Sequence, residues 1–171
     1  SGIAKFRRLE KREYVDTLAH AMYRSSVFDK VGLYNEKLAR TEDNEMHYRM
    51  RQAGFKFLLS PDIVSYQIVR NSLVGMIKQK FNNGKWIGIT IKYCPKCFSL
   101  YHFVPMLFVI SLIISLILFL IGFPYFLVLI AIMYSLFNII NLISIIINNE
   151  FHFLYLLLPF CFFVLHISYG L

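Results

Sequence analysis

Residues 103–121 read FVPMLFVISLIISLILFLI, an apolar run without a charged residue. Crossing the hydrocarbon core of a membrane, which is about 30 Å thick, takes about 20 apolar residues in a helix. Two further runs of similar length follow, at residues 125–147 and 151–171. A buried helix of a soluble protein would be shorter and would show a polar face. We therefore expect α-helical transmembrane segments over residues 103–171.

Charge is confined to the part of the chain before these runs. All 18 lysine and arginine residues lie between Lys5 and Lys96, together with nine of the ten acidic residues. The distribution excludes a single soluble globule, a disordered tail and an evenly basic nucleic-acid-binding domain. Because basic loops stay on the cytoplasmic side, we expect a multi-pass protein of the cell (inner or plasma) membrane with its charged part in the cytoplasm. Membrane lipids are then expected partners, and nucleic acid is not.

The charged part is predicted to mix short helices and strands. Ser26 is predicted to cap a helix over 27–31 that Gly32 stops, and Thr41 is predicted to cap a second helix that ends at Gly54. Extended segments are predicted at 14–23, 55–59 and 63–68. Ser72 is predicted to cap a helix to about Phe81, ended by Asn82-Asn83-Gly84, with residues 86–93 lying on the membrane surface. This alternation predicts an α/β or α+β domain.

The densest acidic cluster of the chain is Thr41-Glu42-Asp43-Asn44-Glu45. A carboxylate at a helix N-terminus is held ionised, which suits a general base that takes a proton from a hydroxyl group. Compensation of the helix dipole explains the same residues without any chemistry. Asp43 and His47, at i and i+4, offer only two metal ligands, too few for a site.

Two further groups of residues each have a structural and a functional interpretation. Cys94-Pro95-Lys96-Cys97 is a CxxC without the second pair that a zinc ribbon needs, so we expect two incidental thiols. Gln79, Lys85 and Trp86 fit an interfacial belt at the membrane surface. The same three residues could instead stack on a sugar and bind a phosphate.

Taken in order, these segments resemble a known family. Residues 22–38, MYRSSVFDKVGLYNEKL, are similar to the "yR…vFe.vGlfdE.l" signature of family 2 glycosyltransferases. Residues 41–54, TEDNEMHYRMRQAG, are similar to the "ED.el..Rlr..G" motif of that family. The stretch from Arg70 to Trp86, followed by an apolar run opening at Pro105, resembles the membrane-attached branch that builds succinoglycan and other exopolysaccharides.

The resemblance implies a partial GT-A-like α/β domain, the acceptor-side portion of a nucleotide-diphosphosugar transferase. Residues 1–71 would be the C-terminal portion of this catalytic domain, 72–102 an amphipathic interfacial segment and 103–171 the transmembrane region. Asp43 would be the catalytic base of an inverting transfer. Glu42 would shape the acceptor site. Gln79, Lys85 and Trp86 correspond loosely to the family's Gln…Arg-Trp motif and would also bind the acceptor.

The resemblance also places part of the machinery outside these residues. The Asp-x-Asp motif and the uridine-binding Asp of the family would lie upstream of Ser1. A divalent metal, Mg²⁺ or Mn²⁺, is therefore expected for the full-length enzyme with its ligands in that upstream part, and no metal ligand is assigned here. The 171 residues alone are expected to be inactive, because half a nucleotide site cannot bind the donor.

The leading hypothesis is thus a membrane-anchored hexosyltransferase. It would move a sugar from a nucleotide-sugar donor to a lipid-linked or polysaccharide acceptor at the cytoplasmic face. The alternative is a non-enzymatic membrane protein, a transporter fragment or scaffold, with a basic cytoplasmic domain. A third possibility is a degenerate transferase that keeps the fold without the activity.

Overall fold

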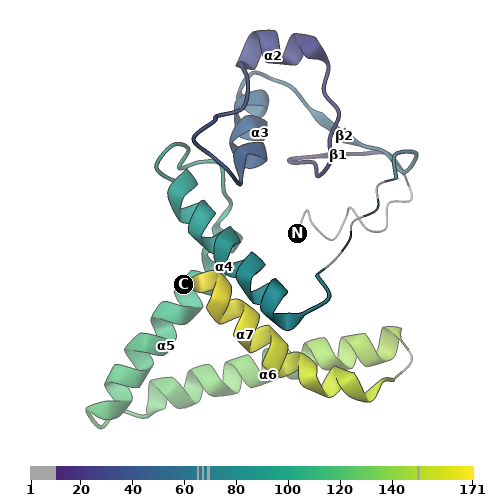
Figure 1. Cartoon of the computed structure of the whole chain (residues 1–171). Coiled ribbons are helices and arrows are strands. Elements are labelled where there is room, and N and C mark those ends of the chain that lie inside the picture. The colour runs from purple at the N-terminus through teal and green to yellow at the C-terminus, as the bar shows by residue number, and fades with distance from the viewer. Residues whose placement is uncertain (1–10, 65, 67, 69, 150) are drawn as a thin grey trace. The chain divides into compact units, whose positions relative to one another are not determined.

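The computed structural model describes residues 11–64, 66, 68, 70–149 and 151–171. The chain divides into two compact units. The first unit comprises the described part of Ser1–Val69 together with Trp86–Ser99, and the second unit comprises Arg70–Lys85 together with Leu100–Leu171. Most described residues are helical (Figure 1).

The first unit is built from two helices and a small sheet. Helix α2 spans Ser25–Val31 and helix α3 spans Glu42–Gln52. Strands β1 (Glu13–Val15) and β2 (Phe57–Leu59) pair antiparallel, with Tyr14 opposite Leu58. Alternation along β2 buries Phe57 and exposes Leu58, as expected for a sheet with one covered face.

A small hydrophobic core holds these elements together. Its fully enclosed members are Met46 and Met50 of α3, with Val27 of α2 and Phe57 of β2 around them. Met46 and Met50 are four residues apart and therefore share one face of α3. The predicted helix between Thr41 and Gly54 is confirmed, and Gly54 has the positive φ of +86° that is typical of the end of such a helix.

Arg49 connects α3 to the loop that follows α2. Its guanidinium donates to Glu45 Oε1 at 2.7 Å and to Glu45 Oε2 at 2.9 Å. It also donates to the carbonyl oxygens of Val31 and Leu33. Such a bidentate pair with two additional carbonyl acceptors fixes the path of the loop against the helix.

The strands are shorter than the extended segments that the sequence predicts. Of the predicted extended segment 14–23 only the first two residues lie in β1, and of 55–59 only Phe57–Leu59 lie in β2. Among the described residues of 63–68 there is no strand. The predicted α/β sheet is thus limited, within the described ranges, to two strands, because Ser60-Pro61-Asp62 turns the chain and no partner strand follows.

Helix α4 spans Leu73–Thr90 without a break. Ser72 caps its start as predicted, since the Gly75 N–H donates to Ser72 Oγ at 3.2 Å. The predicted stop at Asn82-Asn83-Gly84 is wrong, because the helix continues into the segment 86–93. That this segment lies on the membrane surface stays a prediction. A glycine inside a helix costs only about 1 kcal/mol. Gly84 also permits a close approach in the second unit, because a Cβ there would fall on the carbonyl oxygen of Tyr169.

The second unit contains the apolar helices α5 (Val104–Leu120), α6 (Tyr125–Asn148) and α7 (Leu158–Gly170). The short 3₁₀ helices η1 (Leu100–Phe103) and η2 (Phe153–Leu157) extend α5 and α7 at their starts. Leu100–Leu120, Tyr125–Asn148 and Phe153–Gly170 are each long and apolar enough to cross a membrane. The predicted spans at 103–121, 125–147 and 151–171 are therefore confirmed as such helices.

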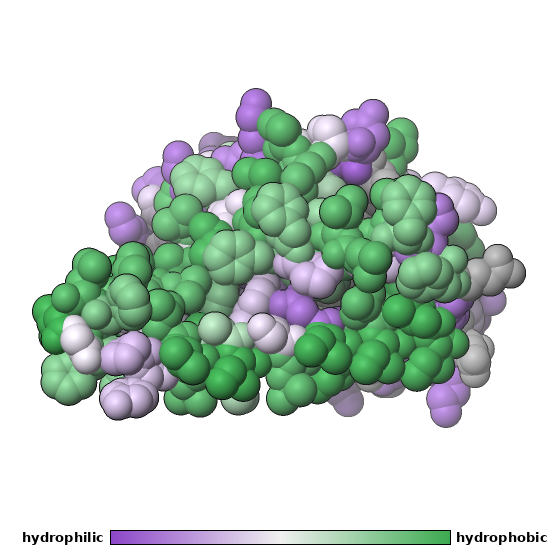
Figure 2. Space-filling model, turned by 90° about the horizontal axis from the view of Figure 1, so that it is seen from below, coloured by the Kyte–Doolittle hydropathy of each residue, from purple (hydrophilic) through white to green (hydrophobic). Residues whose placement is uncertain are grey.

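Most of the surface of these helices is not covered by protein. No more than 11% of any candidate span is buried inside the structure. Figure 2 shows a face on which hydrophobic side chains predominate. In a soluble protein this much exposed apolar area would cause aggregation, whereas in a bilayer it contacts lipid. Membrane association follows.

Polar side chains inside the second unit connect its helices. The hydroxyl of Tyr134 in α6 lies 2.8 Å from Nδ1 of His166 in α7. Phe108 of α5 stacks on the Tyr134 ring with a centroid distance of 4.7 Å. Gly170 lets α7 approach α5 closely, because a Cβ there would fall on the carbonyl of Pro105. Small residues at crossing points are a common basis of helix packing in membranes.

The two cysteines of the CxxC motif form a disulfide, contrary to the two thiols that we expected. Both belong to a turn after α4 in which the Cys97 N–H donates to the Cys94 carbonyl at 3.2 Å. A turn of this type, with proline at its second position, brings its first and fourth Cα atoms close together. The Cα atoms are 5.5 Å apart, within the usual range for a disulfide.

Candidate active site

The site is built at the N-terminus of α3, where the chain takes an unusual turn. Thr41 has a φ of +62°, which is rare for a β-branched residue. Contrary to the prediction, its hydroxyl does not cap α3. Instead it lies 2.6 Å from the hydroxyl of Thr90, which is fully buried at the end of α4, and it also donates to the Arg40 carbonyl. Such backbone strain is commonly found at functional sites.

Glu42 and Asp43 follow directly in the first turn of the helix. Both side chains are half-buried. Asp43 Oδ1 accepts from the Asn44 backbone N–H at 2.8 Å and from Asn44 Nδ2 at 3.0 Å. Glu42 Oε2 is buried and has no hydrogen-bond partner among the described residues. A buried carboxylate oxygen without a donor is uncommon.

His47 lies one turn further along α3 and is fully buried. The Thr17 hydroxyl is 2.7 Å from its Nδ1, and the Tyr23 hydroxyl is 2.5 Å from its Nε2. Burial lowers the pKa of His47, although the nearby Asp43 carboxylate opposes this and Arg51 adds to it. Burial raises the pKa of Tyr23, and the side chains of Tyr34 and Asp43 raise it further. A neutral imidazole and a neutral phenol therefore lie close to the Asp43 charge.

This arrangement uses both nitrogens of His47 and so leaves none for a metal. Within the described part of the chain, no three histidine, cysteine, aspartate or glutamate side chains gather as a metal site. What the arrangement offers is a pair of adjacent carboxylates, Glu42 and Asp43, at the positive end of a helix dipole. Such carboxylates can accept protons or hydrogen bonds from sugar hydroxyl groups.

The other predicted site residues all lie on α4. Gln79 and Lys85 belong to the second unit, whereas Asp43 and Glu42 belong to the first. Trp86 is in the first unit and is half-buried, and Lys85 is exposed. Gln79 and Trp86 are seven residues apart and share a face of the helix, from which Lys85 is rotated by about a third of a turn. That these three residues meet Asp43 at one acceptor site stays a prediction.

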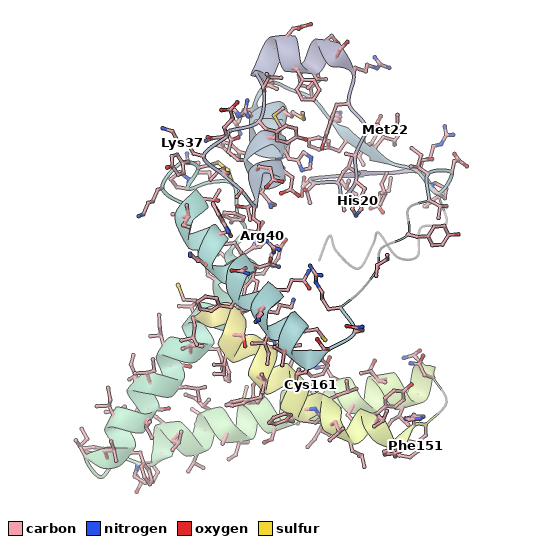
Figure 3. All side chains as sticks on the ribbon, viewed as in Figure 1. His20, Met22, Lys37, Arg40, Phe151 and Cys161 are labelled. Atoms are coloured by element: carbon pink, nitrogen blue, oxygen red, sulfur yellow. A yellow bond between two sulfur atoms is a disulfide. The ribbon has the colours of Figure 1, made fainter. Side chains whose placement is uncertain are left out.

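Sequence reasoning missed the residues that support the acidic pair. Tyr23 stands within the segment that resembles the family signature, and the spacing of four residues between Asp43 and His47 does not indicate the partners of the imidazole. No local signal marks Thr17 or Thr90, because each acts through a contact distant in sequence. His20 and Met22, labelled in Figure 3, stand between Thr17 and Tyr23 in the sequence and are exposed.

Comparison with protein-family models, with curated protein sequences and with solved structures finds no match for this chain.

The stability of the first unit is expected to depend on pH through His47. Because folding lowers the pKa of His47 below its ordinary value of 6.5, the unfolded chain takes up a proton first as the pH falls. The stabilisation that the neutral His47 side chain contributes is therefore present above about pH 6.5. It is lost as the pH falls through the lower pKa that His47 has in the folded state. Urea titrations of the detergent-solubilised chain at several pH values, followed by methyl NMR of Met46 and Met50, measure this loss.

The matched comparison replaces His47 and His20 by glutamine, one at a time. His47→Gln is expected to flatten the dependence below about pH 6.5, whereas His20→Gln keeps the slope of the wild type, because His20 is exposed. An unchanged slope in His47→Gln would assign the pH dependence to another group.

Proposed function

We propose that the chain is the C-terminal part of a membrane-anchored, inverting glycosyltransferase of the GT-A type. The observation that carries the proposal is the pair Glu42 and Asp43 at the start of α3. Glu42 presents a buried oxygen without a partner among the described residues, and Asp43 has one oxygen bound by Asn44. The order of segments that resembles family 2 glycosyltransferases supports the same assignment.

In this mechanism Asp43 is the general base. An acceptor hydroxyl donates its hydrogen bond to the Asp43 carboxylate, and its oxygen attacks the anomeric carbon of the donor sugar. The new bond joins acceptor oxygen and anomeric carbon, the bond from that carbon to the diphosphate breaks, and the nucleoside diphosphate leaves. Attack from the opposite side inverts the anomeric configuration. The proton of the hydroxyl goes to the Asp43 carboxylate.

The neighbouring residues position this base. Asn44 holds one carboxylate oxygen through two hydrogen bonds and so orients the other toward the acceptor. His47, held by Thr17 and Tyr23, fills the interior behind α3 as a neutral group and keeps the helix in place. The bond between Thr41 and Thr90 anchors the first turn of α3 to the end of α4. A base must be held within hydrogen-bond reach of its proton, and these contacts serve that need.

The remaining parts of the proposal concern ligands and membrane. The donor is a nucleotide sugar, and the acceptor is a lipid-linked glycan or polysaccharide. A divalent metal would bind the donor diphosphate through upstream residues, and an Asp-x-Asp motif after a strand there would support this. Gln79, Lys85 and Trp86 would contact the acceptor. The basic part would face the cytoplasm, because the positive-inside bias depends on basic residues close to a span, and Lys92 and Lys96 lie just before the first one.

Glu42→Gln tests the acceptor role of this site. In the full-length protein, exchange of the unpaired carboxylate for an amide is expected to raise the KM for the acceptor about tenfold, because hydrogen bonds to charged groups contribute about 1.5–3 kcal/mol. The KM for the donor should stay constant. Initial rates of labelled-sugar transfer, measured against each substrate in turn, separate the two constants.

The control for this variant is Glu36→Gln, which changes an exposed carboxylate on the loop before α3. It is expected to leave both constants unchanged. A normal acceptor KM in Glu42→Gln would remove Glu42 from the acceptor site. If the full-length protein transfers no sugar from any nucleotide-sugar donor, the non-enzymatic scaffold becomes the better explanation.

A further inference from the structure

The first unit contains a cleft that the proposed transfer does not use. Its volume is about 410 Å³, within the range of small-molecule sites. Residues of α3 and of the turn after α4 line it: Glu45, Tyr48, Arg49, Tyr93, Cys94, Pro95 and Lys96. Glu45, Tyr48 and Arg49 follow one another at helical spacing on one side of α3, which Glu42 shares, whereas Asp43 and His47 lie on another. Neither Glu42 nor Asp43 belongs to the lining of the cleft.

The cleft carries a net positive charge once the ion pair between Glu45 and Arg49 is counted as neutral. Arg49 is engaged by both carboxylate oxygens of Glu45, so these two side chains neutralise each other. Lys96 is exposed on the lining and forms no ion pair within the described residues. Lys37, labelled in Figure 3, extends from the loop before α3 and places its Nζ 6.0 Å from the centroid of the Tyr93 ring. The ammonium groups of Lys96, on the lining, and of Lys37, beside the Tyr93 ring, are thus near a lining whose one carboxylate, Glu45, is paired with Arg49.

The two tyrosines complete the chemistry of the site. Tyr93 is about half exposed, and Tyr48 is half-buried on the opposite wall. A phenol has an apolar ring and a hydroxyl that donates a hydrogen bond. Ammonium and hydroxyl donors together select a phosphate group, and the ring faces accept the apolar part of a molecule that carries it.

The place of the cleft in the chain indicates which phosphate it meets. Lys96 is followed by the first apolar span, which begins at Leu100, so the lining belongs to the segment that enters the membrane. Lys92 adds a further exposed cation in the same segment. Basic juxtamembrane residues are attracted by anionic lipid, and tyrosines are enriched at the level of the headgroups. We propose that this cleft binds the phosphate of an anionic phospholipid headgroup.

Photo-crosslinking in nanodiscs tests the proposal. The chain is embedded in phosphatidylcholine that contains a small fraction of phosphatidylglycerol with a photoreactive headgroup, and the labelled peptides are identified by mass spectrometry. Label is expected on the peptides that contain Tyr48 and Tyr93. The double variant Lys37→Gln/Lys96→Gln should lose label about tenfold or more, because each basic residue near an anionic surface contributes about fivefold.

Two control variants distinguish a specific site from charge and from folding. Lys11→Gln/Lys56→Gln removes the same charge from exposed positions outside the cleft and is expected to keep the label. Lys37→Arg/Lys96→Arg restores the charge and should restore the label. Label spread evenly over the peptides of Lys11 and Lys56, or unaffected by Lys37→Gln/Lys96→Gln, would show diffuse attraction and overturn the proposal.

A competition arm separates a lipid phosphate from a free one. Inorganic phosphate added in excess is expected to leave the label in place, because it lacks the glycerol and acyl portions that hold the headgroup at the membrane. Complete displacement by inorganic phosphate would assign the cleft to a soluble phosphate and overturn the lipid assignment. Since none of these readouts involves sugar transfer, the result is independent of the proposed enzymatic activity.

Discussion

Exchange of Asp43 for asparagine in the full-length protein is expected to lower the rate of sugar transfer by about 10²–10⁴-fold, the usual contribution of a general base. Asparagine keeps the size of the side chain and its hydrogen bonds to Asn44, but it cannot accept the proton of the acceptor hydroxyl. Donor binding should be unchanged, because the donor site is expected upstream. Single-turnover transfer and equilibrium binding of the nucleotide sugar measure the two effects separately.

Asp29→Asn is the matched control, since Asp29 is an exposed carboxylate of α2. A second readout is independent of activity. The Asp43 charge opposes the lowering of the His47 pKa, so Asp43→Asn should lower that pKa further, as NMR titration of the imidazole would show. Transfer at the wild-type rate in Asp43→Asn would reject Asp43 as the base, whatever happens to His47.

Met46→Ala is expected to have the largest effect on stability, a loss of about 2–5 kcal/mol in the free energy of unfolding of the first unit. Met46 is fully buried, and among the described residues the core around it has three other buried members, Val27, Met50 and Phe57. A core of this size has few neighbours that can move to fill the cavity. Urea titration of the detergent-solubilised chain, followed by the methyl signal of Met50, gives the difference.

Met22→Ala is the matched control, because Met22 is 88% exposed and loses no packing on truncation. Its midpoint in urea should equal that of the wild type. If Met46→Ala and Met22→Ala unfold at the same urea concentration, the core assigned to α3 does not stabilise this unit.

The transmembrane region was predictable from sequence because its cause is local. A run of apolar residues of the length of residues 103–121 has to satisfy its backbone hydrogen bonds within itself, and only a helix does so in lipid. The predicted boundaries agree with α5, α6 and η2–α7 to within a few residues. The helix α3 was predictable for a similar reason, since its methionine face and terminal Gly54 are local signals.

Helix α4 shows where local signals mislead. Asn82-Asn83-Gly84 resembles a helix end, yet the helix continues because Gly84 allows a close contact with the backbone of Tyr169. The glycine was read as a stop, whereas it marks a packing contact far along the chain. In the same way, the role of His166 as a partner of Tyr134 depends on a neighbouring helix and not on its position near the end of its own.

At the candidate site, local sequence preferences account for the acidic pair. Glu42 and Asp43 stand at the start of a helix because of charge preferences that act over a few residues, and the length of the apolar runs predicts helices able to span a membrane. The surroundings of the pair depend instead on contacts between segments that are distant in the sequence. His47 is bound between Thr17 and Tyr23, Thr41 pairs with Thr90, and Glu42 Oε2 is buried without a partner among the described residues. These hydrogen bonds join residues that are 24 to 49 positions apart in the sequence, and no local preference encodes such contacts.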